Sequence, residues 1–200
     1  MSYEFKTKHM EKAVVNDVVN KETVEDIKLY QKKKNLQRGI TKETCMKFGV
    51  RAALSEKDGK TPTAYYFPSY NQKGEVIGYK KQDVTKNKDE KYHWTSVGTV
   101  AIGNKLFGQN VAEQVNRKHT NCVYTEGEWD CLSVFQAQCD SVKGTKYEGH
   151  QPFVVSIPLG TKNAVEAMLH NKDFVLGYDS MTIFFDDDQA TPLELKKGVM

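Results

Sequence analysis

The sequence contains no C-x-x-C pair, no long apolar run and no apolar segment near its first residues. Isolated cysteines do not form a zinc ribbon, so we expect no zinc site in this chain. No apolar stretch approaches the roughly 20 residues that a membrane helix requires, and residues 1–5 do not resemble a signal peptide. These absences favour a cytoplasmic protein without membrane contact.

The four cysteines are expected to be structural rather than reactive. Cys122 lies in a short apolar run, and Cys131 lies on the apolar side of an expected helix. Because free cysteine behaves as a small apolar residue, we expect buried free thiols at both positions.

Charge is divided unevenly along the 200 residues. The formal net charge is only +3, but residues 1–120 carry 23 basic and 14 acidic residues, whereas residues 121–200 carry 6 and 12. A basic first part joined to an acidic second part suits a polyanion bound by one and cations held by the other. Ordinary variation among solvated faces is the alternative explanation.

The first part of the chain predicts a helix, a second short helix and a hairpin. Residues 10–36 show valines at helical spacing and end in three lysines, which we interpret as a solvated helix end rather than a nucleic-acid contact. Thr41 is placed to cap a short helix that runs to Phe48. Residues 64–84 predict a β-hairpin with its turn at 71–74.

Residues 85–98 are polar and lysine-rich and predict a mobile loop. Tyr92, His93 and Trp94 lie in this loop, where aromatic rings can stack on bases. We favour the simpler interpretation that they pin the loop to its own core. Phe107 is likewise expected to pack rather than to contact a ligand.

From residue 118 onward, apolar runs alternate with helical patterns. Strands are expected at 121–125, 153–157 and 181–185, with helices at about 128–139 and 161–170. Such alternation predicts a parallel sheet with right-handed crossovers. The chain is thus expected to be α/β, or α+β overall. A small basic subdomain with a β-hairpin or sheet would precede a parallel sheet flanked by helices.

Acidic residues directly follow two of these strands. The motif Thr-Glu-Gly-Glu-Trp-Asp occupies 125–130, and Asp-Asp-Asp occupies 186–188. Ligands of parallel sheets bind at the carboxyl ends of the strands, and carboxylates are ligands that Mg²⁺ prefers. Alternate residues of an extended segment point the same way. Asp186 and Asp188 can therefore share a cation that Glu126 also approaches.

The combined pattern resembles the TOPRIM module. It runs from an apolar strand through Thr-Glu-Gly-Glu-x-Asp, a helix, a strand with Ser-Ile-Pro-x-Gly and a second helix to a third strand with Asp-Asp-Asp. Upstream, Arg-Gly-Ile-Thr at 38–41, Phe-Pro at 67–68, Tyr-Lys-Lys at 79–81 and Leu-Phe-Gly at 106–108 resemble the primase half of phage primase–helicases and their mitochondrial relatives. The resemblance covers residues 36–200.

This resemblance implies a DNA primase, a nucleotidyltransferase that makes short RNA primers from ribonucleoside triphosphates on single-stranded DNA. It implies Mg²⁺ as the cofactor, with Mn²⁺ as the alternative. A bacteriophage replication protein of this type would act in the host cytoplasm, with a helicase domain or subunit and a DNA polymerase as partners.

The resemblance also divides the chain into three parts. They are an N-terminal helical segment (1–37), a basic RNA-polymerase-like subdomain (38–117) and a TOPRIM subdomain (118–200). A complete sheet of this kind needs more chain, so we expect a truncated module and a fragment of a longer primase–helicase. A shortened module is the alternative.

Roles for the acidic residues follow from the resemblance. Glu126, Asp186 and Asp188 are expected to be catalytic and, together with Asp130, to hold the metal. The role of Glu126 stays open between metal ligand, contact to a metal-bound water and general base. Each residue has a structural alternative, because a carboxylate at the start of a helix is stabilised by the helix dipole.

Lysines are expected to bind nucleotide or template phosphates as point charges. Lys80 and Lys86 match two basic residues of the phage enzymes in spacing, and Lys91 lies in the same polar segment. Lys162 lies in the loop 158–163, whose Gly-Thr step into a helix offers backbone N–H groups to a phosphate. The alternative for these lysines is simple exposure on a strand or loop.

Two other functions compete with primer synthesis. A primase-like module that no longer polymerises would bind single-stranded DNA and support a helicase ring, but the matched acidic set argues against it. A TOPRIM nuclease would share the metal site, but it has no use for the upstream lysine strand and the Leu-Phe-Gly segment.

Overall fold

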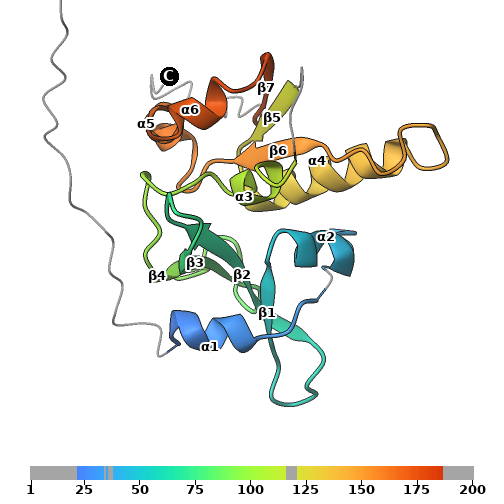
Figure 1. Ribbon diagram of the computed structural model, residues 1–200. Helices are drawn as coiled ribbons and strands as arrows, with labels where there is room; N and C mark the ends of the chain where they lie inside the picture. The colour runs from blue at the N-terminus through green and yellow to red at the C-terminus, as the bar shows by residue number, and fades with distance from the viewer. Residues whose placement is uncertain (1–21, 34, 36–37, 116–120, 187–200) are drawn as a thin grey trace, which may run out of the picture.

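The chain folds into two β-sheets with helices between and around them (Figure 1). The structure is a computed structural model and describes residues 22–33, 35, 38–115 and 121–186. The strands are β1 Arg51–Leu54, β2 Pro62–Tyr70, β3 Val76–Asp83, β4 Trp94–Gly98, β5 Asn121–Thr125, β6 Phe153–Ser156 and β7 Ser180–Phe184. The helices are α1 Val24–Leu29, α2 Lys42–Lys47, α3 Gln109–Ala112, α4 Glu128–Ser141, the 3₁₀ helix η1 Thr161–Asn163, α5 Ala164–His170 and α6 Lys172–Val175.

The first sheet is antiparallel with the strand order β1-β2-β3-β4, and the second is parallel with the order β6-β5-β7. In Figure 1 the layers follow one another from α1 through the antiparallel sheet, α2 and α4, and the parallel sheet to α5 and α6. This arrangement confirms the expected fold class. The three strands expected after residue 118 and the helices between them are all present.

The helix expected over residues 10–36 is confirmed at Val24–Leu29 and is wrong at residues 30–33. α1 ends at Leu29, and Tyr30 already has extended backbone angles. The reason is tertiary, because the carbonyl of Gln31 accepts a hydrogen bond from the N–H of Ala52 at 2.8 Å and so draws the chain along β1. The lysines that follow therefore do not end this helix. The first part of the expected helix lies outside the described residues.

The second short helix and the hairpin are confirmed. The hydroxyl of Thr41 accepts a hydrogen bond from the N–H of Thr44 at 3.2 Å and caps α2, and Phe48 follows as its C-cap. β2 and β3 pair as the expected hairpin around the turn at 71–74.

The loop expected over residues 85–98 is wrong at its end, because β4 occupies its last five residues. Thr95 and Val97 are buried on one side of this strand, whereas Trp94 and Ser96 lie on the other. The alternation is short, and half of its members are Thr and Ser, so it is a weak strand signal.

A single apolar core joins the two sheets. It contains residues from α2, β1, β2, β5, α4 and β6, of which α4 supplies Trp129, Leu132 and Phe135. A second core lies between the parallel sheet and α5 and α6, and a third lies between the antiparallel sheet and α1. Helix α4 is therefore held from both sides, which fixes the carboxyl edge of the parallel sheet relative to β3.

The Leu-Phe-Gly segment also ties the connection between the sheets to β6. Phe107 and Ser156 exchange two backbone hydrogen bonds of 3.2 and 3.0 Å. The Phe107 ring is buried, which confirms its packing role. Gly108 has φ +88°, and a Cβ atom there would lie 2.5 Å from the carbonyl oxygen of Val154.

Cys122 and Cys131 are buried free thiols, as expected. Burial raises the pKa of the Cys131 thiol well above its ordinary value, so it stays protonated and unreactive. In the part of the chain that the structure describes, no helix combines the length and the apolarity needed to span a membrane. The expected subdomain boundaries at 37/38 and 117/118 adjoin residues outside the described ranges and stay predictions.

We expect Gly108→Ala to lower the free energy of unfolding by about 3 kcal/mol, because a positive φ and a close backbone contact are both violated. Urea unfolding followed by far-UV circular dichroism measures this loss. Gly144→Ala is the matched control. Its φ is also positive, at +70°, but no atom lies within 4 Å of the added Cβ, so we expect a loss of about 1 kcal/mol. Equal losses in the two variants would contradict the packing role of Gly108.

Candidate functional site at the carboxyl edge of the parallel sheet

The two acidic segments meet at the carboxyl edge of the parallel sheet. β5 and β7 are neighbours and run parallel, so Glu126 and Asp186 leave the sheet side by side. The backbone N–H of Asp186 donates to Oε2 of Glu126 at 3.4 Å. The sequence-based prediction that these segments are neighbours is therefore confirmed. Asp188 lies outside the described residues.

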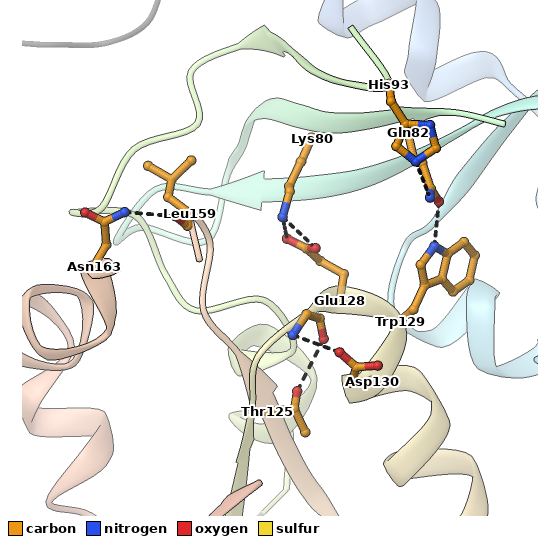
Figure 2. A network of polar contacts seen from close by, with 10 residues as sticks. Lys80, Gln82, His93, Thr125, Glu128, Trp129, Asp130, Leu159 and Asn163 are labelled. Carbon is orange, nitrogen blue, oxygen red and sulfur yellow. Dashed lines mark hydrogen bonds and ion pairs between the residues drawn. The ribbon is translucent and has the colours of Figure 1, made fainter. Parts of the chain in front are cut away.

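The turn after β5 is fixed from inside the sheet. Thr125 is fully buried, and its hydroxyl lies 3.2 Å from the carbonyl oxygen of Val155 and 3.3 Å from that of Gly127. These contacts hold the backbone that carries Glu126, and Figure 2 shows the contact with Gly127.

Asp130 caps helix α4. Its Oδ2 atom accepts a hydrogen bond from the N–H of Gly127 at 3.1 Å (Figure 2). This is a stabilising position for a carboxylate, because the first backbone N–H groups of a helix need acceptors. The predicted metal role of Asp130 stays a prediction, and the capping contact is the part of its role that the structure shows.

Glu128 forms a buried ion pair with Lys80. The ammonium of Lys80 lies 2.8 and 3.0 Å from the two carboxylate oxygens, and Glu128 is only 3% exposed (Figure 2). Burial raises the pKa of Glu128, and the charge of Lys80 opposes that shift. The sequence-based prediction placed Lys80 at phosphates but gave Glu128 no role. The only available signal was that Glu128 stands inside the Thr-Glu-Gly-Glu motif.

Trp129 docks α4 onto the antiparallel sheet. Its indole N–H donates to Oε1 of Gln82 at 2.7 Å, and its ring packs edge-on against Tyr65 and Phe67 at centroid distances of 5.0 and 4.9 Å. Because that oxygen of Gln82 accepts from Trp129, its amide nitrogen is left to donate to Nε2 of His93 at 3.1 Å (Figure 2).

The same chain of contacts reaches the lysine-rich segment. With Nε2 accepting, His93 carries its proton on Nδ1 and donates to the carbonyl oxygen of Lys86 at 3.2 Å. His93 is buried. The expectation that residues 92–94 pin this segment to the core is therefore confirmed for His93.

Of the other predicted lysines, Lys86 is half-buried, whereas Lys91 and Lys162 are exposed. Lys86 lies 3.8 Å from Asp83 and near the Tyr92 ring, at 5.5 Å from its centroid. Lys91 lies over the same ring at 4.8 Å. Lys162 is exposed in η1, which follows β6 at the carboxyl edge of the parallel sheet. The structure thus brings Lys80 to the start of α4, and Lys86 and Lys91 together on the connection between β3 and β4.

The donor chemistry at this edge fits a hard cation. Glu126 and Asp186 offer carboxylate oxygens, which Mg²⁺ prefers, and within the described ranges neither is in an ion pair. The described residues contain no group of three or more metal-ligating side chains. A complete predicted set would need Asp188 as well.

No family model matches the chain. The primase fragment of the bacteriophage T7 primase–helicase is similar in structure, with a TM-score of 0.58 and 24% identity over 80% of this chain and 56% of that one. A structure of the T7 lagging-strand DNA polymerase with primase domains of two gp4 subunits, an RNA/DNA hybrid and dTTP gives 0.57 and 25% over 85% and 74%. A DnaG primase catalytic domain bound to ssDNA gives 0.50 and 16% over 76% and 52%.

The fold is therefore that of a TOPRIM-type primase core. Within that class the chain resembles the primase part of phage primase–helicases. It spans 56% of the length of the T7 primase fragment.

We expect Lys80→Met to lower the free energy of unfolding by about 3 kcal/mol, because it leaves the Glu128 carboxylate buried without its partner. Without Lys80 the raised pKa of Glu128 rises further. A group whose folded pKa is raised stabilises the fold below that pKa and loses this contribution as the pH rises through it. The loss should therefore be larger at pH 8 than at pH 5 in urea titrations.

Two variants control this experiment. Adding Glu128→Gln to Lys80→Met should recover part of the stability and remove the pH dependence of the loss. Lys143→Met breaks a pair with Asp140 in which both side chains are exposed, so it should leave the unfolding midpoint unchanged. A Lys80→Met variant as stable as the parent chain would contradict a buried ion pair.

Proposed function

We propose that this chain is the catalytic part of a DNA primase, which makes short RNA primers from ribonucleoside triphosphates on single-stranded DNA. The observation that carries the proposal is the approach of Glu126 to Asp186 at the edge where a lysine from the antiparallel sheet also arrives. The fold is shared with primases, and related structures were solved with an RNA/DNA hybrid and dTTP or with ssDNA.

Phosphoryl transfer demands positioning and charge neutralisation more than covalent participation by the protein. Mg²⁺ would be held by Glu126, Asp186 and Asp188, with Asp130 nearby, and would neutralise triphosphate charge and lower the pKa of an attacking hydroxyl. The protein supplies a rigid edge for this chemistry, because β5 is hydrogen-bonded on both sides and α4 is docked on the antiparallel sheet.

The basic residues would receive the polyanions. Lys80, Lys86 and Lys91 lie on β3 and the connection that follows it, and Lys162 lies on the strand-end loop of the parallel sheet. Lysine binds phosphate as a point charge without demanding one geometry. This suits a template that must advance and a triphosphate that must enter and leave. A helicase and a DNA polymerase are the partners we propose by analogy with the phage proteins.

We expect the chain to form short RNA products with labelled ribonucleotides, Mg²⁺ and single-stranded DNA. Asp186→Asn and Glu126→Gln should each lower this activity by about 100-fold or more, because metal-held charge stabilisation is worth several kcal/mol. Gel electrophoresis of the products measures the effect. Asp140→Asn, on the far end of α4, is the matched control and should keep full activity.

The same reaction separates the competing functions. DNA binding without RNA products, in a chain extended at its C-terminus as well as in this one, would contradict the proposal and favour a binding module that supports a helicase. Shortening of the labelled DNA would instead identify a nuclease.

A further inference from the structure

Trp94 presents an aromatic ring on the face of the antiparallel sheet that turns toward α4. It pairs with Gln82 across the two strands, and Lys80 pairs with Ser96. Directly opposed residues of antiparallel strands share a face, so Trp94 lies on the same face as Lys80 and Gln82. Those two residues contact Glu128 and Trp129 at the start of α4. Trp94 therefore borders the same face as the proposed site.

The Trp94 ring is held in place, yet it is open to solvent. The ammonium of Lys80 lies 4.7 Å from its centroid, and the rings of Phe67 and His93 lie at 5.9 Å. Glu128 fixes Lys80 in turn. In spite of these contacts Trp94 is 40% exposed. Trp129, by contrast, is 3% exposed, and its indole N–H donates a hydrogen bond to Gln82. Packing in the core accounts for the position of Trp129, whereas two fifths of the Trp94 surface is left exposed to solvent.

An exposed, immobilised indole beside several lysines has the chemistry of a site for single-stranded nucleic acid. Bases stack on aromatic rings without regard to sequence, while lysines follow the phosphates. The segment that leads into Trp94 carries Lys86 and Lys91, and Lys80 lies against the ring. Holding the ring in advance lowers the ordering cost of binding.

We propose that Trp94 is a stacking platform for a nucleobase of the single-stranded DNA template. This inference deepens the proposed function, because it assigns the site's substrate a specific contact on β4. Lys80 and Glu128 act as positioning residues for the platform. Tyr92 is a weaker candidate, because it stands on a loop with φ +66° and lacks the strand pairing that fixes Trp94.

Intrinsic fluorescence tests the proposal on the full chain, which has only two tryptophans. We expect oligo-dT to quench the emission, and an abasic oligonucleotide of equal length to leave it unchanged at the same ionic strength. Trp94→Phe should abolish the quenching. Quenching by the abasic strand, or quenching by ribonucleoside triphosphates but not by oligo-dT, would overturn the assignment to a template base.

The affinity of the chain for single-stranded DNA gives an independent test of the stacking platform. By fluorescence anisotropy of a labelled oligo-dT, Trp94→Leu should bind about 5- to 100-fold more weakly, and Trp94→Phe should recover most of the loss. Tyr147→Leu is the matched control. That ring is also exposed, at 58%, with Lys146 at 5.0 Å from its centroid, but it follows the C-terminal end of α4, at the end of the helix opposite to Glu128. The affinity of Tyr147→Leu for oligo-dT should equal that of the parent chain.

The outcomes separate this inference from the primase proposal. Quenching by oligo-dT in a chain that makes no primers would leave the platform standing and count against the polymerase. Active primer synthesis with unchanged DNA affinity in Trp94→Leu would overturn the platform alone. If Trp94→Leu unfolds at a lower urea concentration than the parent chain, the fluorescence test decides: quenching by oligo-dT that persists in Trp94→Phe would overturn the platform.

Discussion

The docking of the first turn of α4 on the antiparallel sheet is the interaction on which the site depends. Glu126 directly follows β5 of the parallel sheet and Lys80 lies in β3 of the antiparallel sheet, so neither sheet alone fixes the distance between them. Glu128 and Trp129 do so, because they follow Glu126 after Gly127 alone and contact Lys80 and Gln82. Figure 2 shows both contacts leaving adjacent residues of one helical turn.

Polar contacts give this docking its specificity. An apolar core tolerates small shifts if its volume is kept, whereas a buried carboxylate or indole N–H needs its partner at hydrogen-bond distance. Glu128 and Trp129 each have one such partner on β3. The second contact continues through Gln82 and His93 to the lysine-rich connection. Docking and the placement of that connection are therefore parts of one network.

The sequence predicted those features that depend on local pattern. The strands of the parallel sheet are apolar and β-branched, and acidic residues follow them directly, so the meeting of Glu126 and Asp186 could be predicted. The end of α1 and the presence of β4 could not, because both depend on pairing with distant strands. The motif likewise named Glu128 and Trp129 without revealing that they turn toward β3 instead of toward the edge where Glu126 and Asp186 meet.

The ion pair between Lys80 and Glu128 changes the interpretation of the uneven charge along the chain. Part of the complementarity between its basic and acidic parts is internal, since Lys80 is already paired with Glu128. Lys81, its neighbour on β3, turns to the opposite face and pairs with Glu22 at 2.6 Å. Adjacent strand residues point to opposite faces, so these two lysines serve two different layers. An approaching phosphate meets Lys80 only in competition with Glu128. Under the proposed function, the attraction of a polyanion would therefore rest on the exposed lysines of the loops, because Lys80 is already paired with Glu128.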